Sequence, residues 1–259
     1  MYCNILGYPL NKPRSVKIWK DFFKSNNMNI SMHACQIHPI NFDSFVKTLL
    51  KDKNYFASAI TMPFKKKVLP FVKISDKITK NAQSINFMYK QKNKIYGYNT
   101  DVYGALDCIK KKKKKIILIY GFGGVGEALL RTFSKIYKKT NFIVVSKKNK
   151  PRDIKDRNIK FIKKKSFLNL DNIDIAINCS PLGSNLSKKF INNSPFKQKE
   201  LLKRKKNLFI FDLVYKPKST LLNKLCKKYK IDYLNGLKMN TIQANEALKI
   251  IKKNYFKQS

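Results

Sequence analysis

Histidine is almost absent from this chain of 259 residues, which contains only His33 and His38. A Ser-His-Asp triad needs a histidine as its base, and only these two are present. Two histidines five positions apart without nearby acids also make a poor metal site. We therefore expect structural roles for both histidines and no metal site.

Cysteine pairs and long apolar runs are also lacking. The five cysteines, at positions 3, 35, 108, 179 and 226, form no Cys-x-x-Cys motif, which is typical of reduced thiols rather than a disulfide framework or a zinc site. No apolar run is long enough for a membrane span, and the first residues lack the basic start and apolar stretch of a signal peptide. We expect a cytoplasmic protein without a membrane partner.

Acidic residues and arginines are both few. The chain has 15 Asp and Glu against 56 Lys and Arg, a net charge of +41, and only five of the 56 are arginine. Proteins that read nucleic acid favour arginine, whose planar fork matches phosphates and guanine edges. Lysine, asparagine, isoleucine, phenylalanine and tyrosine are all abundant, and all have A/T-rich codons. The charge therefore indicates compositional drift, and we expect no specific nucleic-acid partner.

The strongest motif is a glycine-rich turn between an apolar run and a helical pattern. The run at 116–120 leads into Gly121-Phe122-Gly123-Gly124-Val125-Gly126, and Glu127 continues a helix. Gly-x-Gly-x-x-Gly in this context binds a dinucleotide, because glycines let the backbone approach the pyrophosphate at the positive end of the helix. The sequence therefore predicts a Rossmann-type domain in which Gly121, Gly123, Gly124, Val125 and Gly126 bind the cofactor.

The next strand indicates which dinucleotide is bound. An NAD-binding protein usually places Asp or Glu after this strand, where the carboxylate accepts from the ribose hydroxyls. Here the strand at 141–145 is followed by Ser146-Lys147-Lys148-Asn149-Lys150, which contains no acid. Because cations suit a 2′-phosphate, we predict NADP as cofactor, held by Ser146, Lys147 and Lys148.

Strand-like and helix-like segments alternate on both sides of the glycine turn. Before it we expect strands at 2–6, 30–37 and 56–61, a hairpin at 85–96, a helix capped by Ser15 and a helix at 42–50. After it we expect strands at 142–145, 173–178, 208–211 and 231–233, and a long helix that follows Gly236. The pattern predicts an α/β protein whose first domain has a mostly parallel sheet.

Several segments together resemble the shikimate dehydrogenases. Thr61-Met62-Pro63-Phe64-Lys65 is similar to that family's Asn-Val-Thr-x-Pro-(Phe/Tyr)-Lys. Further similar segments follow in the family's order across nearly the whole chain: Ser84-Ile85-Asn86, Gly97-Tyr98-Asn99-Thr100-Asp101, Ile177 to Gly183, Asp212 to Leu222, and Gly236 to Ala244. The resemblance implies an N-terminal α/β substrate domain, residues 1–100 plus 237–259, and a Rossmann-type NADP-binding domain, residues 101–236.

The resemblance also implies an activity, the NADPH-dependent reduction of 3-dehydroshikimate to shikimate in aromatic amino-acid biosynthesis. Hydride arriving at a ketone builds negative charge on oxygen, so a nearby acid must supply a proton. Lys65 can do so as an ammonium, while Asp101 orients it and binds a substrate hydroxyl. By the same resemblance Ser15, Thr61, Asn86, Asp101, Tyr215 and Gln243 bind the substrate, and Asn178, Leu213 and Gly236 contact the cofactor.

The chain departs from the family pattern at three positions. Pro13 stands where the family has one of two carboxylate-binding serines, Ala59 replaces an asparagine, and Val102 replaces a glycine. A hydrogen bond to a charged group contributes roughly 1.5–3 kcal/mol, so losing one hydroxyl should weaken substrate binding on the order of ten-fold. These changes indicate a slower enzyme, which we expect to be a monomer or homodimer.

Two other functions fit parts of the sequence. A quinate/shikimate dehydrogenase that uses NAD would share most of the motifs, but Ser146-Lys147-Lys148 argues against NAD. A basic nucleotide-fold protein that binds nucleic acid without catalysis would explain the charge, but the presence of both Lys65 and Asp101 argues against that function.

Overall fold

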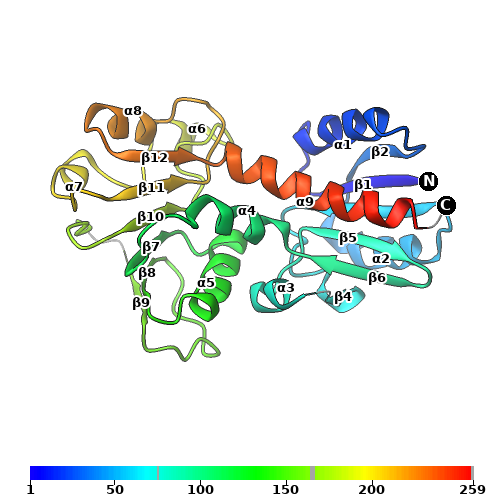
Figure 1. Cartoon of the computed structure of the whole chain (residues 1–259), viewed down its shortest axis with the longest axis horizontal. Coiled ribbons are helices and arrows are strands. Elements are labelled where there is room, and N and C mark those ends of the chain that lie inside the picture. The colour runs from blue at the N-terminus through cyan, green and yellow to red at the C-terminus, as the bar shows by residue number, and fades with distance from the viewer. Residues whose placement is uncertain (75, 164–166, 258–259) are drawn as a thin grey trace. The chain divides into compact units, whose positions relative to one another are not determined.

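The computed structural model describes residues 1–74, 76–163 and 167–257. The chain divides into two compact units, one of residues 1–104 and 241–259 and the other of residues 105–240. Two helices, α4 (Thr100–Ile109) and α9 (Leu237–Tyr255), run from one unit into the other (Figure 1).

The first unit is built on a six-stranded mixed sheet in the order β2-β1-β3-β5-β6-β4. β1, β2 and β3 pair in parallel and so do β4 and β6, whereas β5 is antiparallel to both of its neighbours. The expected hairpin forms β5 and β6, and it makes the sheet mixed. The elements are β1 (Tyr2–Gly7), α1 (Arg14–Ser25), β2 (Ser31–Gln36), α2 (Phe42–Lys51), β3 (Tyr55–Ile60), β4 (Lys73–Ile74), α3 (Lys77–Ala82), β5 (Phe87–Gln91) and β6 (Lys94–Tyr98), with 3-10 turns at Pro39–Asn41 and Leu69–Phe71.

Both faces of this sheet are covered, because successive strand residues point to opposite sides. Phe87 and Tyr89 of β5 pack with Trp19 and Phe23 of α1 and with the end of α9, whereas Met88 belongs to the opposite core with α2. The rings of Trp19 and Phe87 meet edge to face, with centroids 5.9 Å apart. The helical spacing of apolar residues in α1 therefore produces the buried face that the sequence predicts.

The start of α1 differs from the expectation. Ser15 is not the cap of the helix, because the helix begins at Arg14 and Pro13 occupies the N-cap position. Proline has no side-chain acceptor, so no side-chain hydrogen bond caps α1. Pro13 is in extended backbone geometry, and its carbonyl accepts a hydrogen bond from the backbone N–H of Val16 at 3.2 Å.

The second unit has a six-stranded sheet in the order β12-β11-β10-β7-β8-β9, in which all pairs are parallel. Numbered from β7, this is the strand order of the doubly wound dinucleotide-binding fold, so the predicted fold class is confirmed. The elements are β7 (Ile116–Tyr120), α5 (Gly124–Ile136), β8 (Asn141–Val145), β9 (Ile159–Ile162), β10 (Ile175–Asn178), α6 (Lys188–Ile191), α7 (Gln198–Leu202), β11 (Phe209–Asp212), α8 (Leu221–Lys228) and β12 (Asp232–Asn235).

Helices cover both faces of this sheet as well. Leu118, Ala176 and Ile210 share one core with residues of α7 and α8. The residues next to Leu118 and Ala176 in the chain point to the other face of the sheet. Helix α5 packs on that face through buried residues such as Leu129 and Phe133 (Figure 1). The near-continuous apolar runs of the strands are typical of a parallel sheet that is buried on both sides.

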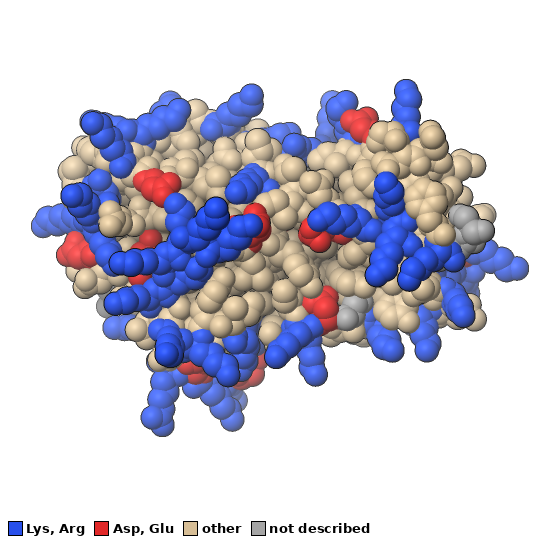
Figure 2. Space-filling view, viewed as in Figure 1, with Lys and Arg blue, Asp and Glu red and all other residues tan. Residues whose placement is uncertain are grey.

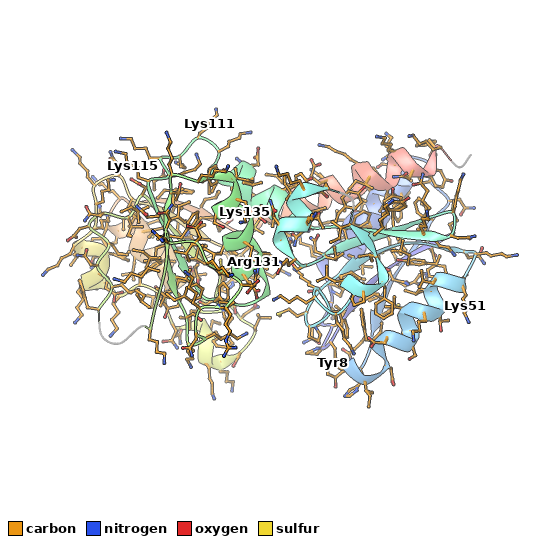
Figure 3. All side chains as sticks on the ribbon, turned by 90° about the horizontal axis from the view of Figure 1, so that it is seen from below. Tyr8, Lys51, Lys111, Lys115, Arg131 and Lys135 are labelled. Carbon is orange, nitrogen blue, oxygen red and sulfur yellow. The ribbon has the colours of Figure 1, made fainter. Side chains whose placement is uncertain are left out.

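On the face drawn in Figure 2, lysine and arginine side chains are scattered over both units, and acidic side chains are sparse among them. Some lysines still have defined partners. In the run at 111–115, Lys111 is exposed (Figure 3), whereas Lys114 donates to the carbonyls of Lys110 and Lys112 and Lys112 pairs with Asp232. Within the described part of the chain, no helix is both long and apolar enough to cross a membrane.

Candidate active site

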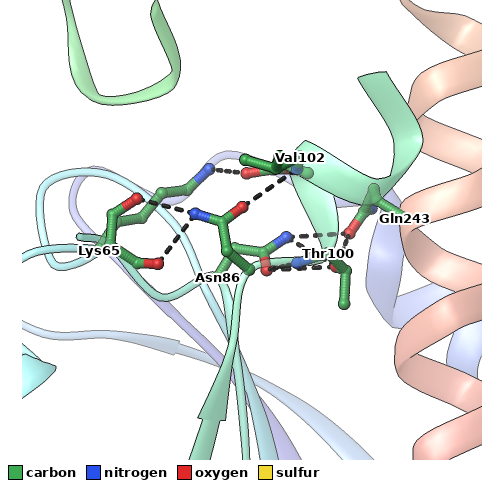
Figure 4. Close-up of polar contacts among 8 residues, drawn as sticks. Lys65, Asn86, Thr100, Val102 and Gln243 are labelled. Carbon is green, nitrogen blue, oxygen red and sulfur yellow. Dashed lines mark hydrogen bonds and ion pairs between the residues drawn. The ribbon is translucent and has the colours of Figure 1, made fainter. Parts of the chain in front are cut away.

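The two predicted catalytic residues, Lys65 and Asp101, form an ion pair in the first unit. The Lys65 Nζ atom donates to Asp101 Oδ2 at 2.6 Å, and the two side chains are 17% and 15% exposed (Figure 4). Lys65 lies in the turn that follows β3, and Asp101 lies in the first turn of α4, where the helix dipole stabilises a carboxylate. The structure thus brings the two predicted catalytic residues together as an ion pair that is largely shielded from water.

Backbone and ring contacts fix the turn that carries Lys65. Its carbonyl accepts from the N–H of Ile85 at 2.7 Å, next to Asn86. The preceding residue, Phe64, is fully buried and stacks on Phe42, with ring centroids 4.1 Å apart. One anchor is Lys65's own carbonyl and the other is the residue directly before it, so the backbone that carries the Lys65 side chain is held in place.

A polar network beside the pair joins Asn86, Thr100 and Gln243. Asn86 Oδ1 accepts from the Thr100 backbone N–H at 2.6 Å, and Asn86 Nδ2 donates to Thr100 Oγ1 at 2.9 Å and to Gln243 Oε1 at 3.3 Å (Figure 4). The Thr100 hydroxyl also lies 3.2 Å from Gln243 Oε1. Two of the predicted substrate-binding amides are therefore held by a threonine that directly precedes Asp101.

Thr100 and Asn99 were not among the predicted site residues. Asn99 is 1% exposed, donates to the carbonyl and hydroxyl of Ser84, and accepts from the Val102 N–H at 3.2 Å. It therefore fixes the start of α4, which carries Asp101. The signal was present in the sequence, since both residues belong to the segment Gly97 to Asp101 that carried the family resemblance.

The remaining predicted substrate ligands lie at separate places. Thr61 directly follows β3, is half-buried, and packs so closely on Gly7 that a Cβ at Gly7 would lie 2.4 Å from its Cγ2 atom. Ser15 lies half-buried in the first turn of α1. Tyr215 belongs to the second unit, where it is half-buried in the segment that follows β11. Of the three departures from the family pattern, Val102 is fully buried, whereas Pro13 and Ala59 are half-buried.

In the second unit the glycine turn follows β7 at the carboxyl edge of the sheet. Gly121 has a φ of +99°, and a Cβ at Gly126 would lie 2.1 Å from the Gly121 carbonyl oxygen, so both positions require glycine. Gly123 and Gly124 are exposed, and a Cβ at either would meet nothing within 4 Å. Gly123 is the N-cap of α5 and gives it no side-chain acceptor. The first N–H groups of α5 can therefore bind an anionic pyrophosphate.

The other predicted cofactor residues lie at the carboxyl ends of neighbouring strands. The Gly121 N–H donates to the Val145 carbonyl at 2.9 Å, which places the turn beside Ser146. Lys147 and Lys148 follow and are exposed. Asn178 is the last residue of β10. A Cβ at Gly236 would lie 2.1 Å from the carbonyl oxygen of Leu213, so Gly236 and Leu213 pack backbone to backbone.

A buried carboxylate, absent from the predicted site, ties three of these strand ends together. Asp212 is 0% exposed and accepts from Asn178 Nδ2 at 2.8 Å, from the Val214 N–H at 3.1 Å and from the Tyr233 hydroxyl at 3.1 Å. Burial raises the pKa of Asp212 to about 6, although each of these donors lowers it. Asp212 is the first residue of the segment Asp212 to Leu222 that carried the family resemblance, so a signal was present in the sequence although no role was assigned to it.

These features define a class of protein. The second unit has a doubly wound sheet with a glycine turn at its switch point, and the first unit is an α/β unit that holds a shielded Lys–Asp pair. This combination is the architecture of a dinucleotide-dependent dehydrogenase.

Comparison with known proteins narrows the class. The family model described as shikimate dehydrogenase substrate binding domain matches residues 5–88. The shikimate dehydrogenase (NADP(+)) of Clostridium botulinum strain 657 is 27% identical over 248 residues, 94% of this chain and 93% of that protein. The same enzyme of Methanocaldococcus jannaschii is 28% identical over 263 residues, 95% of this chain and 89% of that one. Over nearly its whole length the chain is therefore similar to shikimate dehydrogenases, and its first unit matches their substrate-binding domain.

Solved structures agree in fold. A crystal structure of a shikimate dehydrogenase in complex with NADP+ has a TM-score of 0.83 at 23% identity and covers 99% of this chain and 95% of its own. The shikimate dehydrogenase of Aquifex aeolicus has a TM-score of 0.81 at 22% identity, with 97% and 92% covered. The solved structures confirm the fold, and the family model and the curated relatives confirm the resemblance that the motifs indicated.

Proposed function

We propose that this protein catalyses the reversible, NADPH-dependent reduction of 3-dehydroshikimate to shikimate, a step towards aromatic amino acids. The observation that carries the proposal is the Lys65–Asp101 ion pair, which lies next to the Asn86–Gln243 network in the unit matched by the substrate-binding family model. The curated relatives of nearly full length are named for the same reaction and for NADP.

The pair has the chemistry that a ketone reduction needs. When bound, the nicotinamide supplies a hydride to the carbonyl carbon. The carbonyl oxygen becomes an alkoxide, and Lys65 donates a proton to it. Asp101 orients the ammonium at 2.6 Å and accepts a hydrogen bond from a neighbouring substrate hydroxyl. In the oxidative direction neutral Lys65 takes the proton back.

The other substrate contacts are assigned by chemistry. Asn86 and Gln243 offer amides to the ring hydroxyls, and the 3.3 Å contact between them is long enough to yield to a bound hydroxyl. Thr61, Ser15 and Tyr215 offer hydroxyls, the last two to the substrate carboxylate. We assign residues 1–100 plus 237–259 to substrate binding and residues 101–236 to NADP binding.

The cofactor contacts follow from the carboxyl edge of the second sheet. The glycine turn and the first N–H groups of α5 hold the pyrophosphate. Ser146, Lys147 and Lys148, with no acid among them, receive the 2′-phosphate. Asn178, Leu213 and Gly236 contact the nicotinamide half, and Gly236 packs directly on the Leu213 backbone, where a Cβ would lie 2.1 Å from the Leu213 carbonyl oxygen.

The direct test mixes the purified protein with shikimate and either NADP or NAD and follows the absorbance of the reduced nicotinamide. We expect turnover with NADP and much slower turnover with NAD. A preference for NAD, or turnover with quinate but not with shikimate, would support the quinate/shikimate dehydrogenase instead. No turnover with any of these pairs would contradict the proposal.

We further propose that the protein acts in the cytoplasm, as a monomer or homodimer, without a specific nucleic-acid partner. The five free cysteines, three of them buried, support a reducing compartment. A titration with duplex DNA at increasing salt tests the last point, because purely electrostatic binding by scattered lysines should disappear at physiological salt. Tight binding under those conditions would favour the nucleic-acid hypothesis.

A further inference from the structure

Arg131, one of only five arginines in the chain, makes a forked ion pair in the second unit. From α5 its Nη1 atom donates to Asp153 Oδ2 at 2.6 Å and its Nη2 atom to Asp153 Oδ1 at 3.3 Å. Its Nε atom donates to Glu127 Oε1, one turn earlier, at 2.9 Å. The Arg131 and Glu127 side chains are each 12% exposed, and Asp153 is 57% exposed. The guanidinium is thus fixed on its helix and contacts an acid that is more than half exposed.

Asp153 belongs to the segment that carries the predicted 2′-phosphate ligands. Between Val145 and Ile159 every residue is described, and the chain there forms neither helix nor strand. The segment contains Lys147 and Lys148 and starts beside the glycine turn, because the Gly121 N–H donates to the Val145 carbonyl. Arg131 therefore joins the helix that begins at the glycine turn to the segment that follows β8.

Some other anchors of this segment hold its two ends, where the Ser146 N–H donates to the Ile162 carbonyl and Asn158 Nδ2 donates to the Lys138 carbonyl, and the rest are local. Lys150 Nζ donates to the carbonyls of Asp156 and Ile159, and the Lys148 N–H donates to Ser146 Oγ at 2.9 Å. These local bonds shape the segment but lie within it or reach only the start of β9. The Arg131–Asp153 pair instead connects its middle to α5, and its two parallel bonds fix orientation as well as distance.

A lysine could not make the same connection. An ammonium is a single point charge on a flexible stem, whereas the guanidinium contacts Glu127 and both oxygens of Asp153 at once. In a chain whose composition strongly favours lysine, the only forked side chain on α5 occupies the one position where two acids must be bridged.

We propose that Arg131 is a positioning residue for recognition of the cofactor's 2′-phosphate: its pair with Asp153 holds the 146–153 segment, and with it Lys147 and Lys148, beside the glycine turn. Figure 3 shows Arg131 on its helix. The inference rests on the proposed function only in its choice of NADP as the cofactor. It predicts that the fork affects affinity for the phosphorylated ribose and leaves binding of the rest of the nucleotide almost unchanged.

Binding fragments of the cofactor separate these effects without any turnover. We would titrate 2′,5′-ADP and 5′-AMP into the full-length protein by calorimetry, for the wild type, Arg131→Lys and Asp153→Asn. Arg131→Lys keeps the charge and loses the fork, and we expect affinity for 2′,5′-ADP to fall about ten-fold while affinity for 5′-AMP changes less than about two-fold. Lys135→Met is the control, because it removes an exposed cation from the same helix one turn further on.

Asp153→Asn distinguishes positioning from simple electrostatics. Removing an acid near a phosphate site should strengthen phosphate binding if only charge matters. If the pair positions the lysines, affinity for 2′,5′-ADP falls instead, as in Arg131→Lys. Thermal melting of each variant shows whether the second unit is still folded, and the exposed Asp153 provides a variant that should fold if Arg131→Lys does not.

Three outcomes would overturn the inference. Tighter binding of 2′,5′-ADP by Asp153→Asn would show that the acid acts through its charge alone. A parallel loss for both ligands in Arg131→Lys would show a general structural role. A wild-type protein that binds both ligands equally would refute the choice of NADP, and the inference with it. Failure to oxidise shikimate, by contrast, would affect only the proposed reaction and its substrate.

Discussion

Lys65 Nζ lies 2.6 Å from Asp101 Oδ2, although 36 residues separate them in the chain. The protein has 56 basic side chains and 15 acidic ones, so most of its cations have no acid to pair with. Shielding from water strengthens this pair relative to the surface pairs, such as Lys17–Asp21, whose side chains are 85% and 65% exposed. The fold thus singles out one lysine of the Lys65-Lys66-Lys67 run.

Replacement of Lys65 by alanine should abolish most of the catalysis. General acid catalysis contributes roughly 10²–10⁴-fold, so we expect kcat to fall by that order while affinity for NADPH stays within about two-fold of wild type. Steady-state kinetics and a binding titration measure the two effects. Lys67→Ala is the matched control, because Lys67 pairs with Asp43 and the Pro39 carbonyl instead of Asp101. Equal kcat values in the two variants would rule out the proton-donor role.

Asp101→Asn should act through the same pair. The amide keeps the shape and loses the charge that orients Lys65, so we expect kcat to fall by about ten-fold or more. In a double-mutant cycle with Lys65→Ala, the second change should add much less than it does alone, because two residues that act as one unit are not additive. Full additivity of the two effects on kcat/KM would mean that the residues work independently.

The sequence predicted those parts of the fold that depend on local pattern. The glycine turn, the apolar runs of β7, β8, β10 and β11 and the amphipathic α1 were each readable, because period and glycine placement are local properties. The short β4 and β9 and the helices α3, α6, α7 and α8 were not predicted, because their few residues carry too little periodicity. Ser15 was mistaken for a cap, because Pro13, which occupies the N-cap position, has no side-chain acceptor that would mark it as one.

The motifs predicted which residues belong to the candidate site, but not how those residues are joined. Lys65, Asn86, Asp101 and Gln243 were found by resemblance, and the structure places all four in one polar region. Three interactions that the sequence did not predict connect partners between 14 and 34 positions apart. They are the bond between Asn86 and Thr100, the bond from Asn178 to the buried Asp212 and the Arg131–Asp153 fork. Hydrogen bonds of that kind leave no periodic trace, and only the fold shows them.

The glycine turn allows two alanine variants with opposite expectations. In Gly126→Ala the new Cβ would lie 2.1 Å from a backbone oxygen that has no room to move, so we expect the unfolding free energy to fall by about 1–3 kcal/mol. In Gly123→Ala the Cβ meets nothing within 4 Å and φ is −88°. Alanine is a poorer N-cap residue than glycine but lowers the entropy of the unfolded chain, so the two effects offset each other and the unfolding free energy should change by about 0.5 kcal/mol or less.

Dinucleotide binding should respond differently from stability. The methyl group of Gly123→Ala would occupy the open space in front of α5, so affinity for NADP should fall by about ten-fold or more in a protein as stable as the wild type. Urea unfolding and calorimetric titration measure the two quantities. Unchanged NADP affinity in Gly123→Ala would show that the pyrophosphate does not lie over this turn.

Asp212 should make stability depend on pH in a direction unusual for a carboxylate. Burial raises its pKa from 3.8 to about 6 in the folded protein, so the folded state holds a proton that the unfolded state has already released. Stability from this group is therefore present below about pH 4 and is lost as the pH rises to about 6, by up to about 3 kcal/mol. Most paired carboxylates, by contrast, lose stability as the pH falls.

Asp212→Asn removes this titration and keeps a side chain of the same size. The difference in unfolding free energy between wild type and variant should therefore shift by up to about 3 kcal/mol in favour of the variant between about pH 4 and about pH 7. The exposed Asp171, replaced by asparagine in the same unit, controls for the loss of one negative charge. A constant difference across this range would mean that the donors from Asn178, Val214 and Tyr233 outweigh burial, and that Asp212 stays ionised throughout.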